Sequence, residues 1–480
     1  MNFSMVSYLL GWITLCEGAL LGLPLVVSFL YGESVPAKAF ILTIVLCLLL
    51  GWLLKRRAPV NKTLGLRESF VITALGWIVI SILGALPFLF SGTITNPISA
   101  LFETVSGFTT TGASILPDVE ILPRSILFWR SFTHWIGGMG VLVFLLALMP
   151  LTGGSHVNLM KAESPGPQVE KLVPKVQSTA KTLYGIYIAL TLLQIILLLA
   201  GGMPLFDALT ISFGTAGTGG FGVKNDSLAG YSPYLQNVVT IFMILFGINF
   251  YFYFLLLMRK FRRAAAIEEV RWYLLIIAAA IFTITLNIAW QYQSYGEALR
   301  HAAFQVGSVI TTTGYATTDF NLWPQASKTI LVILMFIGAC AGSTGGGIKV
   351  SRFIILVKSM RKELRHILHP QSVGKITMDE KTVPHEVVRA VNVFMVAYFL
   401  VFLFSVLLVS FDDHDLVTNF TAVAATLNNI GPGLELVGPT GNFSVFSGGA
   451  KLVLTFDMLA GRLELFPLLL LFTRETWRRF

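Results

Sequence analysis

The chain has 480 residues, of which 55% are hydrophobic and only 12% are charged, and its mean hydropathy is +0.76. Soluble domains carry about 25% charged residues, so the composition excludes an ordinary water-soluble protein and indicates a polytopic membrane protein. The formal net charge of +9 does not indicate nucleic-acid binding, because the basic residues cluster in short runs at the ends of apolar segments.

Runs of about 20 mostly apolar residues are typical of membrane-spanning helices. The N-terminus has no basic region and no small-residue cleavage site, so the first run is predicted to be a retained span rather than a signal peptide. Several consecutive spans are separated by a further segment that is too short to cross. The predicted spans lie near residues 5–31, 37–54, 69–91, 124–149, 182–201, 234–258, 271–291, 326–358, 388–410 and 445–473.

Basic residues collect after alternate spans, which predicts that these loops and both termini are cytoplasmic. The opposite loops carry few basic residues: Lys38, Lys224, Lys328 and Lys451. The basic-rich loops carry Lys55, Arg56 and Arg57; Lys161, Lys171 and Lys175; Arg259, Lys260, Arg262 and Arg263; Lys358, Arg361, Lys362 and Arg365; and Arg474, Arg478 and Arg479.

An uncharged stretch rich in glycine and threonine recurs between spans. Its four copies are SGFTTTGAS (106–114), FGTAGTGGF (213–221), SVITTTGYA (308–316) and ATLNNIGPG (425–433). Aligned without gaps, one glycine coincides in all four: Gly112, Gly219, Gly314 and Gly431. In the first two copies a proline, Pro97 or Pro204, stands the same distance upstream, which predicts the first turn of a short helix. Four copies about a hundred residues apart suggest a pseudo-fourfold ring.

Each copy therefore predicts a span, a short re-entrant helix, a Gly-centred hairpin and a second span. The expected fold class is an all-α polytopic membrane protein with four pseudo-symmetric membrane–pore–membrane repeats around a central pore plus an N-terminal helix pair. The expected divisions are the N-terminal two-helix extension 1–68 and the repeats 69–160, 161–262, 263–380 and 381–480.

Such hairpins are suited to binding a dehydrated cation. Non-helical backbone at membrane depth is stable only where protein buries it or water reaches it, and a ring of carbonyl oxygens replaces an ion's water shell. Oxygen ligands without carboxylates favour a monovalent ion over Ca²⁺ or Mg²⁺. The alternative is that these small residues merely let helices pack closely. Close packing would explain a single copy of the motif better than four aligned copies. The candidate cation ligands are Thr110, Thr111, Gly112, Thr218, Gly219, Gly220, Thr312, Thr313, Gly314, Asn429, Ile430 and Gly431.

Two further features point to a gate. The run GACAGSTGGGIK (338–349) is expected to break the second span of the third repeat, although Gly338, Gly342 and Gly346 are also spaced for close helix packing. Arg462 lies inside the last span, where a charge costs about 2.5–3.5 kcal/mol or more unless it faces a cavity or a partner. It is expected to face the cavity below the filter, repel cations and touch this run; the alternative is a structural ion pair with nearby Asp457 or Glu464.

The motifs TTTGAS, GTGGFG, TTTGYA and NNIGPG, together with AGSTGGGIK and GRLE, resemble TrkH-type subunits of the Trk/Ktr/HKT superfamily of potassium transporters over nearly the whole chain. The resemblance implies K⁺ as the transported ion with no organic cofactor, a homodimer in the bacterial cytoplasmic (inner) membrane, contact with membrane lipid, and a cytosolic nucleotide-binding ring subunit (TrkA-like) as partner. It also implies that an intramembrane loop in the third repeat is the gate. The candidate gate residues are Gly338, Gly342, Ser343, Thr344, Gly345, Gly346, Gly347, Lys349 and Arg462.

Other functions remain open. A proton- or sodium-coupled K⁺ symporter is compatible with the same residues, and Arg130 with His134 is either a proton-coupling pair or a structural one. Glu103 either supports the first hairpin from behind or adds negative potential outside. An intramembrane enzyme is a remote alternative, since Ser343 with His134 is the only nucleophile–base pair that suggests itself, and nothing orients the histidine.

Overall fold

Long apolar helices and the short helices between them make up most of the protein. The structure, a computed structural model, describes residues 1–56, 59, 64–140, 176–372 and 374–478. Within these residues, six helices are long and apolar enough to cross a membrane, or seven if one bent pair is counted as a span. Many large apolar side chains on α3, α14 and α18 are exposed, as a surface that faces lipid requires.

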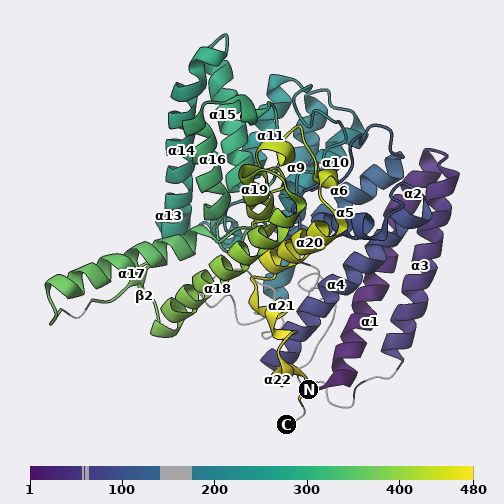
Figure 1. The fold of residues 1–480 in the computed structure, drawn as a ribbon, viewed down its shortest axis with the longest axis horizontal. Helices are drawn as coiled ribbons and strands as arrows, with labels where there is room; N and C mark the ends of the chain where they lie inside the picture. The colour runs from purple at the N-terminus through teal and green to yellow at the C-terminus, as the bar shows by residue number, and fades with distance from the viewer. Residues whose placement is uncertain (57–58, 60–63, 141–175, 373, 479–480) are drawn as a thin grey trace.

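The first three helices form a separate layer at one side of the molecule (Figure 1). They are α1 (Phe3–Leu20), α2 (Gly22–Leu30) and α3 (Ser34–Lys55). Gly11 and Gly51 face each other where α1 and α3 cross, and a Cβ on either would lie 2.9 Å from the other's carbonyl oxygen. The Glu33 carboxylate between α2 and α3 accepts the N–H groups of Arg124 (2.6 Å) and Ser125 (3.0 Å), so this layer is fixed to the start of α6.

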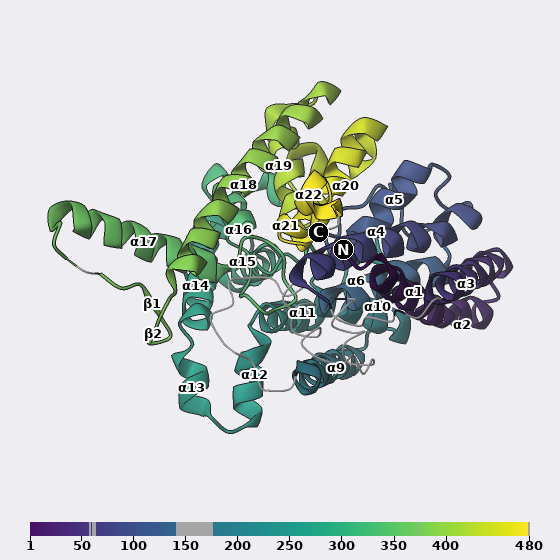
Figure 2. The same ribbon diagram turned by 90° about the horizontal axis from the view of Figure 1, so that it is seen from below.

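Four groups of helices surround a common centre (Figure 2). Each has a long helix, a short helix and a second helix. The second helix of each group packs on the short helix of the next: α6 on α10, α11 on α15, α16 on α19, and α20 on α5. This cyclic order is what a pseudo-fourfold ring requires. The groups are α4 (Leu66–Phe90), α5 (Pro97–Phe108) and α6 (Arg124–Gly138); α9 (Val176–Ala200), α10 (Leu205–Gly217) and α11 (Pro233–Phe246); α14 (Glu268–Ile288), α15 (Tyr295–Ile310) and α16 (Gln325–Ile337); and α18 (His385–Val409), α19 (Leu416–Leu427) and α20 (Gly448–Arg462).

The second helices break part-way. After α16 the chain leaves the helix for residues 338–349 before α17 (Val350–Leu368), so the predicted break is confirmed. The continuous spans expected over 234–258 and 445–473 are wrong: α11 meets α12 (Phe250–Leu257) at a bend of 91°, and α20 is followed by a break and α21 (Phe466–Leu470). Asn249 in this bend caps α12 by accepting the N–H of Tyr251 at 2.8 Å.

Most of the remaining elements are short. Strands β1 (Thr377–Met378) and β2 (Lys381–Thr382) form an antiparallel hairpin, and α17 projects sideways from the bundle (Figure 1). Part of the span predicted at 124–149 and the repeat boundary at 160/161 lie outside the described residues, as do Arg57, Lys161, Lys171, Lys175 and Arg479. The other short elements are α13 (Phe261–Ala266), α22 (Arg474–Trp477), η1 (Ala289–Gln291), η2 (Phe320–Leu322), η3 (Ser410–Asp412), η4 (Glu435–Val437) and η5 (Phe443–Val445).

Candidate ion-conduction site

All four short helices end in the same left-handed turn. The residues with positive φ are Thr110 (56°), Thr218 (56°), Thr312 (60°) and Asn429 (56°). The next residue in each copy donates its N–H to the carbonyl five positions earlier: Thr111 to Ser106 (2.9 Å), Gly219 to Gly214 (2.7 Å), Thr313 to Ser308 (2.8 Å) and Ile430 to Ala425 (2.8 Å). This is a Schellman cap, whose left-handed position usually holds glycine. A β-branched residue there costs about 1–2 kcal/mol, so the surrounding packing holds the three threonines in a strained conformation.

The glycine two positions further on also has positive φ in every copy. These glycines are Gly112 (77°), Gly220 (79°), Gly314 (87°) and Gly431 (99°). The alignment that put Gly219 in this set is therefore off by one residue in the second copy. The proline spacing misled it, because Pro97 is the first residue of α5, whereas Pro204 caps α10, which starts one residue later.

The four glycines form a closed ring of backbone contacts. No side chain fits at these positions, because the space that a Cβ would take holds a carbonyl oxygen of the next hairpin. Glycine is therefore the only residue that fits at the four ring positions. The polar atoms nearest to these positions are peptide oxygens. The facing pairs are Gly112 with the oxygen of Gly219, Gly220 with Thr313, Gly314 with Ile430, and Gly431 with Thr111.

The loops that follow the ring glycines are also joined in cyclic order. A cavity of about 180 Å³ lies among these loops, with the four ring glycines and the side chains of Asn225, Thr440 and Asn442 in its lining. The ring thus has a polar approach on one side. The bonds that join successive loops run from Val119 N–H to Asn225 Oδ1 (2.9 Å), Leu228 N–H to Ala316 O (2.9 Å), Glu435 N–H to Asn321 Oδ1 (3.1 Å) and Phe443 N–H to Ser114 O (2.8 Å).

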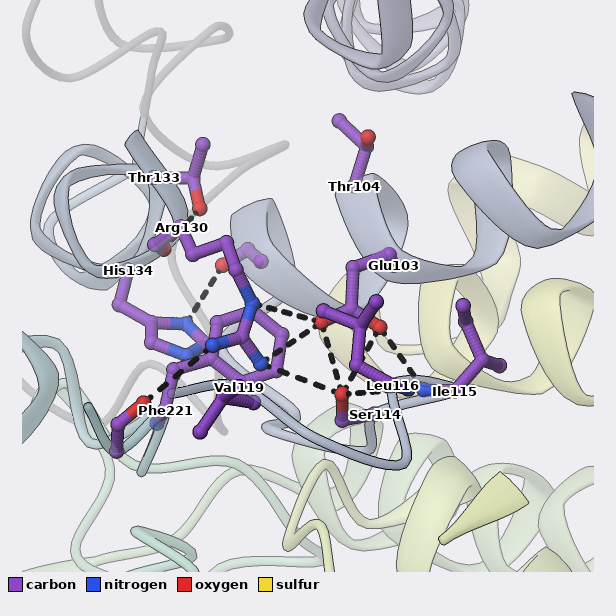
Figure 3. A network of polar contacts seen from close by, with 12 residues as sticks. Glu103, Thr104, Ser114, Ile115, Leu116, Val119, Arg130, Thr133, His134 and Phe221 are labelled. Atoms are coloured by element: carbon purple, nitrogen blue, oxygen red, sulfur yellow. Dashed lines mark hydrogen bonds and ion pairs between the residues drawn. The ribbon is translucent and has the colours of Figure 1, made fainter. Parts of the chain in front are cut away.

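A buried ion pair supports the first hairpin from behind (Figure 3). Glu103 and Arg130 approach to 2.8 Å, and both side chains are almost fully buried. The Glu103 carboxylate also accepts the Ser114 hydroxyl (3.0 Å) and the Ile115 N–H (2.9 Å), while the Arg130 guanidinium lies over the Phe221 ring at 4.1 Å. Of the two roles expected for Glu103, the geometry favours support of the hairpin.

His134 is held by backbone groups of two hairpins. Its Nδ1 lies 2.8 Å from the carbonyl oxygen of Gly107, and its Nε2 accepts the N–H of Phe221 at 3.3 Å. A carbonyl oxygen is only an acceptor, so Nδ1 carries the hydrogen and the ring is the neutral tautomer. These contacts favour the structural interpretation of Arg130 and His134. The Ser343 hydroxyl, considered as a nucleophile with His134, donates to the Cys340 carbonyl at 2.7 Å.

The loop of residues 338–349 contacts the hairpins on the side where they begin. The Gly346 N–H donates to the Thr312 hydroxyl at 2.6 Å, and a Cβ on Gly346 would lie 2.6 Å from the Asn428 carbonyl oxygen. Within the loop, the Lys349 ammonium donates to the carbonyls of Gly345 and Gly346, the second at 3.1 Å. The loop therefore lies against the left-handed turns, with the ring glycines between it and the cavity.

Arg462 connects this loop to the first repeat. Its guanidinium donates to Thr344 O (2.9 Å), the Thr110 hydroxyl (3.2 Å), and the carbonyls of Gly137 (2.5 Å) and Gly138 (2.8 Å) at the end of α6. The expected contact between Arg462 and the loop is present. The carboxylates considered as partners bond elsewhere, since Glu464 pairs with Arg352 and Asp457 accepts the Ser405 hydroxyl at 2.7 Å.

Asn429 was predicted as a cation ligand but not as a contact between hairpins, and Glu269 was not predicted from the sequence. Asn429 donates to the Thr111 hydroxyl (2.9 Å) and to the Met458 carbonyl (2.9 Å), so it closes the ring between the last and first hairpins. Glu269 in the first turn of α14 accepts the N–H groups of Ala341 (2.8 Å) and Ser351 (3.0 Å). An acidic residue in the first turn of a helix is ordinary, so its sequence context gave no signal.

A ring of re-entrant hairpins between broken helices defines a multi-pass membrane transport protein. The chain belongs to the TrkH family of cation transport proteins, whose model matches residues 36–478. It is 38% identical to the Trk system potassium uptake protein TrkH of Salmonella typhimurium and 37% identical to that of Escherichia coli, each over the full length of both chains. The crystal structure of the potassium transporter TrkH from Vibrio parahaemolyticus is similar with a TM-score of 0.88 at 32% identity, covering both chains completely.

Proposed function

We propose that this chain takes up K⁺ through the ring formed by Gly112, Gly220, Gly314 and Gly431. The observation that carries the proposal is that each of these glycines faces a peptide oxygen of the next hairpin. Carbonyl oxygens of this kind replace the hydration shell of a monovalent cation without adding fixed charge. The choice of K⁺ is supported by the relatives, which are named as potassium uptake proteins.

The ligands of this filter are the oxygens at and before the ring glycines. The carbonyls of Thr111, Gly219, Thr313 and Ile430 supply the oxygens that face the glycines. The hydroxyls of Thr110, Thr218 and Thr312 add neutral oxygens at the entrance to each hairpin, and Asn429 takes the equivalent place in the fourth. The repeats that carry them are 69–160, 161–262, 263–380 and 381–480, after the N-terminal extension 1–68.

The gate in this proposal is the loop of residues 338–349 together with Arg462. In this proposal the loop blocks the path below the filter, because it lies against the left-handed turns of three hairpins. Gly346 lies against the third and fourth hairpins, and Arg462 joins Thr344 to the first. Gly338, Gly342 and Gly347 have positive φ, which makes the segment incompatible with helix. Ser343 and Gly345 complete the loop, and Lys349 ties it to itself.

The proposed location is the cytoplasmic (inner) membrane of a bacterium, with both termini in the cytoplasm. The two termini lie at the same face of the molecule (Figure 1), and the chain near them carries Lys55, Arg56, Arg474 and Arg478. The positive-inside rule assigns that face to the cytoplasm. The inward membrane potential then contributes about 2.3 kcal/mol per charge per 100 mV, so uptake needs no chemical step in this chain.

The proposed partners are a second copy of the chain and a cytosolic nucleotide-binding ring subunit. The relatives are named as parts of a Trk system, which supports the existence of further components. α17 projects from the bundle with exposed Met360, Leu364 and Ile367, an apolar surface that is available to a second copy or to lipid. Nucleotide control belongs to the partner, because GSTGGGIK lacks the G-K-[ST] ending of a phosphate-binding loop.

The test is ion flux through the purified protein in liposomes. Under a K⁺ gradient the protein should pass Rb⁺ and K⁺ in preference to Na⁺, and the reversal potential should follow the K⁺ gradient. A reversal potential that also shifts with the pH or Na⁺ gradient would instead show that the protein is a proton- or sodium-coupled K⁺ symporter. Equal passage of Na⁺ and K⁺, or no flux at all, would contradict the proposed filter.

A further inference from the structure

The loop of residues 338–349 has a narrow neck. The Val350 N–H donates to the Ala339 carbonyl at 3.1 Å, and the glycines at the two ends also meet, since a Cβ on Gly338 would lie 3.1 Å from the Gly347 Cα. The segment is therefore a compact loop closed at its base, like the Ω-loops found on protein surfaces. Whatever holds the neck sets the position of the whole loop.

Glu269 bonds both sides of this neck with one oxygen atom. Its Oε1 accepts the N–H of Ala341 at 2.8 Å and the N–H of Ser351 at 3.0 Å. Ala341 is near the start of the loop and Ser351 is the second residue of α17, so residues ten positions apart share one acceptor. The Glu269 side chain is 3% exposed, and hydrogen bonds to a carboxylate shielded from water are the strong kind.

The contact with Ser351 also gives α17 its N-terminal cap. Lys349 precedes the helix with φ of 80° and offers no side-chain cap, so the Ser351 N–H in the first turn takes its partner from outside the helix. A carboxylate at a helix N-terminus satisfies these donors and complements the helix dipole. Glu269 therefore stabilises the point at which the irregular loop becomes a helix.

The same turn of α14 is anchored on its other side. Glu268 pairs with Lys358 of α17 at 2.6 Å, and its N–H donates to Asp379 Oδ1 at 2.6 Å. The Lys358 ammonium also donates to the Thr377 carbonyl of the β1–β2 hairpin at 2.7 Å. The start of α14, the third turn of α17 and the hairpin are thus joined next to Glu269, so the backbone that carries the acceptor is held in place.

We propose that Glu269 is a positioning residue that latches the neck of the 338–349 loop and so holds the loop against the filter. The inference rests on the gate assigned under the proposed function. It predicts that removing the acceptor frees the loop while leaving the hairpin ring intact, because Glu269 contacts the loop and α17 rather than the ring glycines.

Cys340 gives a readout of loop position that does not depend on transport. It lies in the loop, is fully buried and is one of three cysteines in the chain. In a C16A/C47A background in lipid nanodiscs, its reaction with a small water-soluble maleimide reports how often the loop leaves its site. Glu269→Ala and Ser351→Pro should each raise the reaction rate by about tenfold or more, because Glu269→Ala removes both hydrogen bonds of the latch and Ser351→Pro removes one. Proline is tolerated in the first turn of a helix, so Ser351→Pro tests the latch if Glu269→Ala does not fold.

The controls separate the latch from general loosening. Glu269→Gln keeps an oxygen acceptor and should react close to the parent rate. Glu17→Ala removes a carboxylate that is equally buried but lies in α1, and should leave Cys340 unreactive. Unchanged Cys340 reactivity in folded Glu269→Ala or Ser351→Pro protein overturns the latch. Faster Cys340 reaction with unchanged Rb⁺ flux in liposomes supports the latch and contradicts the gate instead.

Discussion

The Arg462 guanidinium donates a hydrogen bond of 2.9 Å to the carbonyl oxygen of Thr344, and it also reaches the Thr110 hydroxyl at 3.2 Å. One side chain of the last repeat thus joins the loop of the third repeat to the first hairpin. Its positive charge lies next to the left-handed turn through which a cation passes in the proposed mechanism. In that mechanism the same residue provides both an electrostatic barrier and a mechanical contact.

Replacing Arg462 with Ala should raise Rb⁺ flux by about tenfold, which corresponds to a barrier lower by about 1.4 kcal/mol. Arg462→Lys is the matched control, because it keeps the charge but loses the several hydrogen bonds that a guanidinium makes. Rb⁺ flux through Arg462→Lys should lie between the flux through the parent protein and the flux through Arg462→Ala. Rb⁺ uptake into liposomes measures all three proteins, and equal flux through Arg462→Ala and the parent protein would remove the arginine from the gate.

The Gly346–Thr312 hydrogen bond should, like the contact of Arg462 with Thr344, hold the 338–349 loop against the hairpins. Thr312→Val removes the hydroxyl that accepts the Gly346 N–H at 2.6 Å, and a buried donor left without a partner costs about 1–3 kcal/mol. We expect greater leak of Rb⁺ and a lower unfolding temperature. Thr104→Val is the control, since that buried hydroxyl bonds a carbonyl of its own helix at 2.8 Å. Similar leak in both variants would show that the bond to Gly346 is unimportant.

The corrected register of the second hairpin is testable by rescue. Gly219→Ala brings a methyl group against the His134 ring, whereas Gly220→Ala meets the Thr313 carbonyl and also requires an unfavourable positive φ. Adding His134→Ala should therefore make Gly219→Ala tolerable, so that the double variant resembles His134→Ala alone. The same addition should not restore Gly220→Ala. The measurement is the selectivity for K⁺ over Na⁺ in liposomes. If His134→Ala also rescued Gly220→Ala, the ring glycine of the second hairpin would be Gly219 and not Gly220.

The Glu103–Arg130 ion pair should contribute mainly to the stability of the folded protein and not directly to ion passage. Removing one partner leaves a buried charge uncompensated, which typically costs about 3–5 kcal/mol. Glu103→Gln and Arg130→Gln should each lower the unfolding temperature of the detergent-solubilised protein, and the double variant should lose less than the sum. Additive losses would mean that the two side chains act independently.

The sequence predicts the fold well where the apolar pattern is uninterrupted. The spans over 37–54, 69–91 and 388–410 correspond to α3, α4 and α18, because some twenty apolar residues in lipid have few alternatives to helix. The Gly-rich run 338–349 was also predicted as a break, since its five glycines and two hydroxyl residues disfavour helix. The breaks after Phe246 and Arg462 were missed because Gly247 and Gly461 are single glycines, which helices commonly accept.

The candidate site was predictable in kind, and its register was predictable in three of the four copies. The ring glycines have positive φ, but the left-handed cap two positions earlier is filled by Thr110, Thr218, Thr312 and Asn429, which the sequence did not indicate. No sequence rule assigns threonine to that conformation, because tertiary contacts hold it there. The partners of Glu269 and Asn429 are equally nonlocal: they lie about 70 and 320 positions away along the chain.

All four hairpins of the ring belong to one polypeptide, and this has a consequence for how the ring can diverge. In an assembly of identical subunits, any substitution appears at every quadrant together. Here a single codon alters one quadrant, as the Asn428–Asn429–Ile430 sequence of the fourth hairpin illustrates beside the threonines of the first and third. Each quadrant is free to specialise, so in the proposed mechanism one carries the segment that blocks the path and another the fixed positive charge, while backbone oxygens keep the lining nearly uniform.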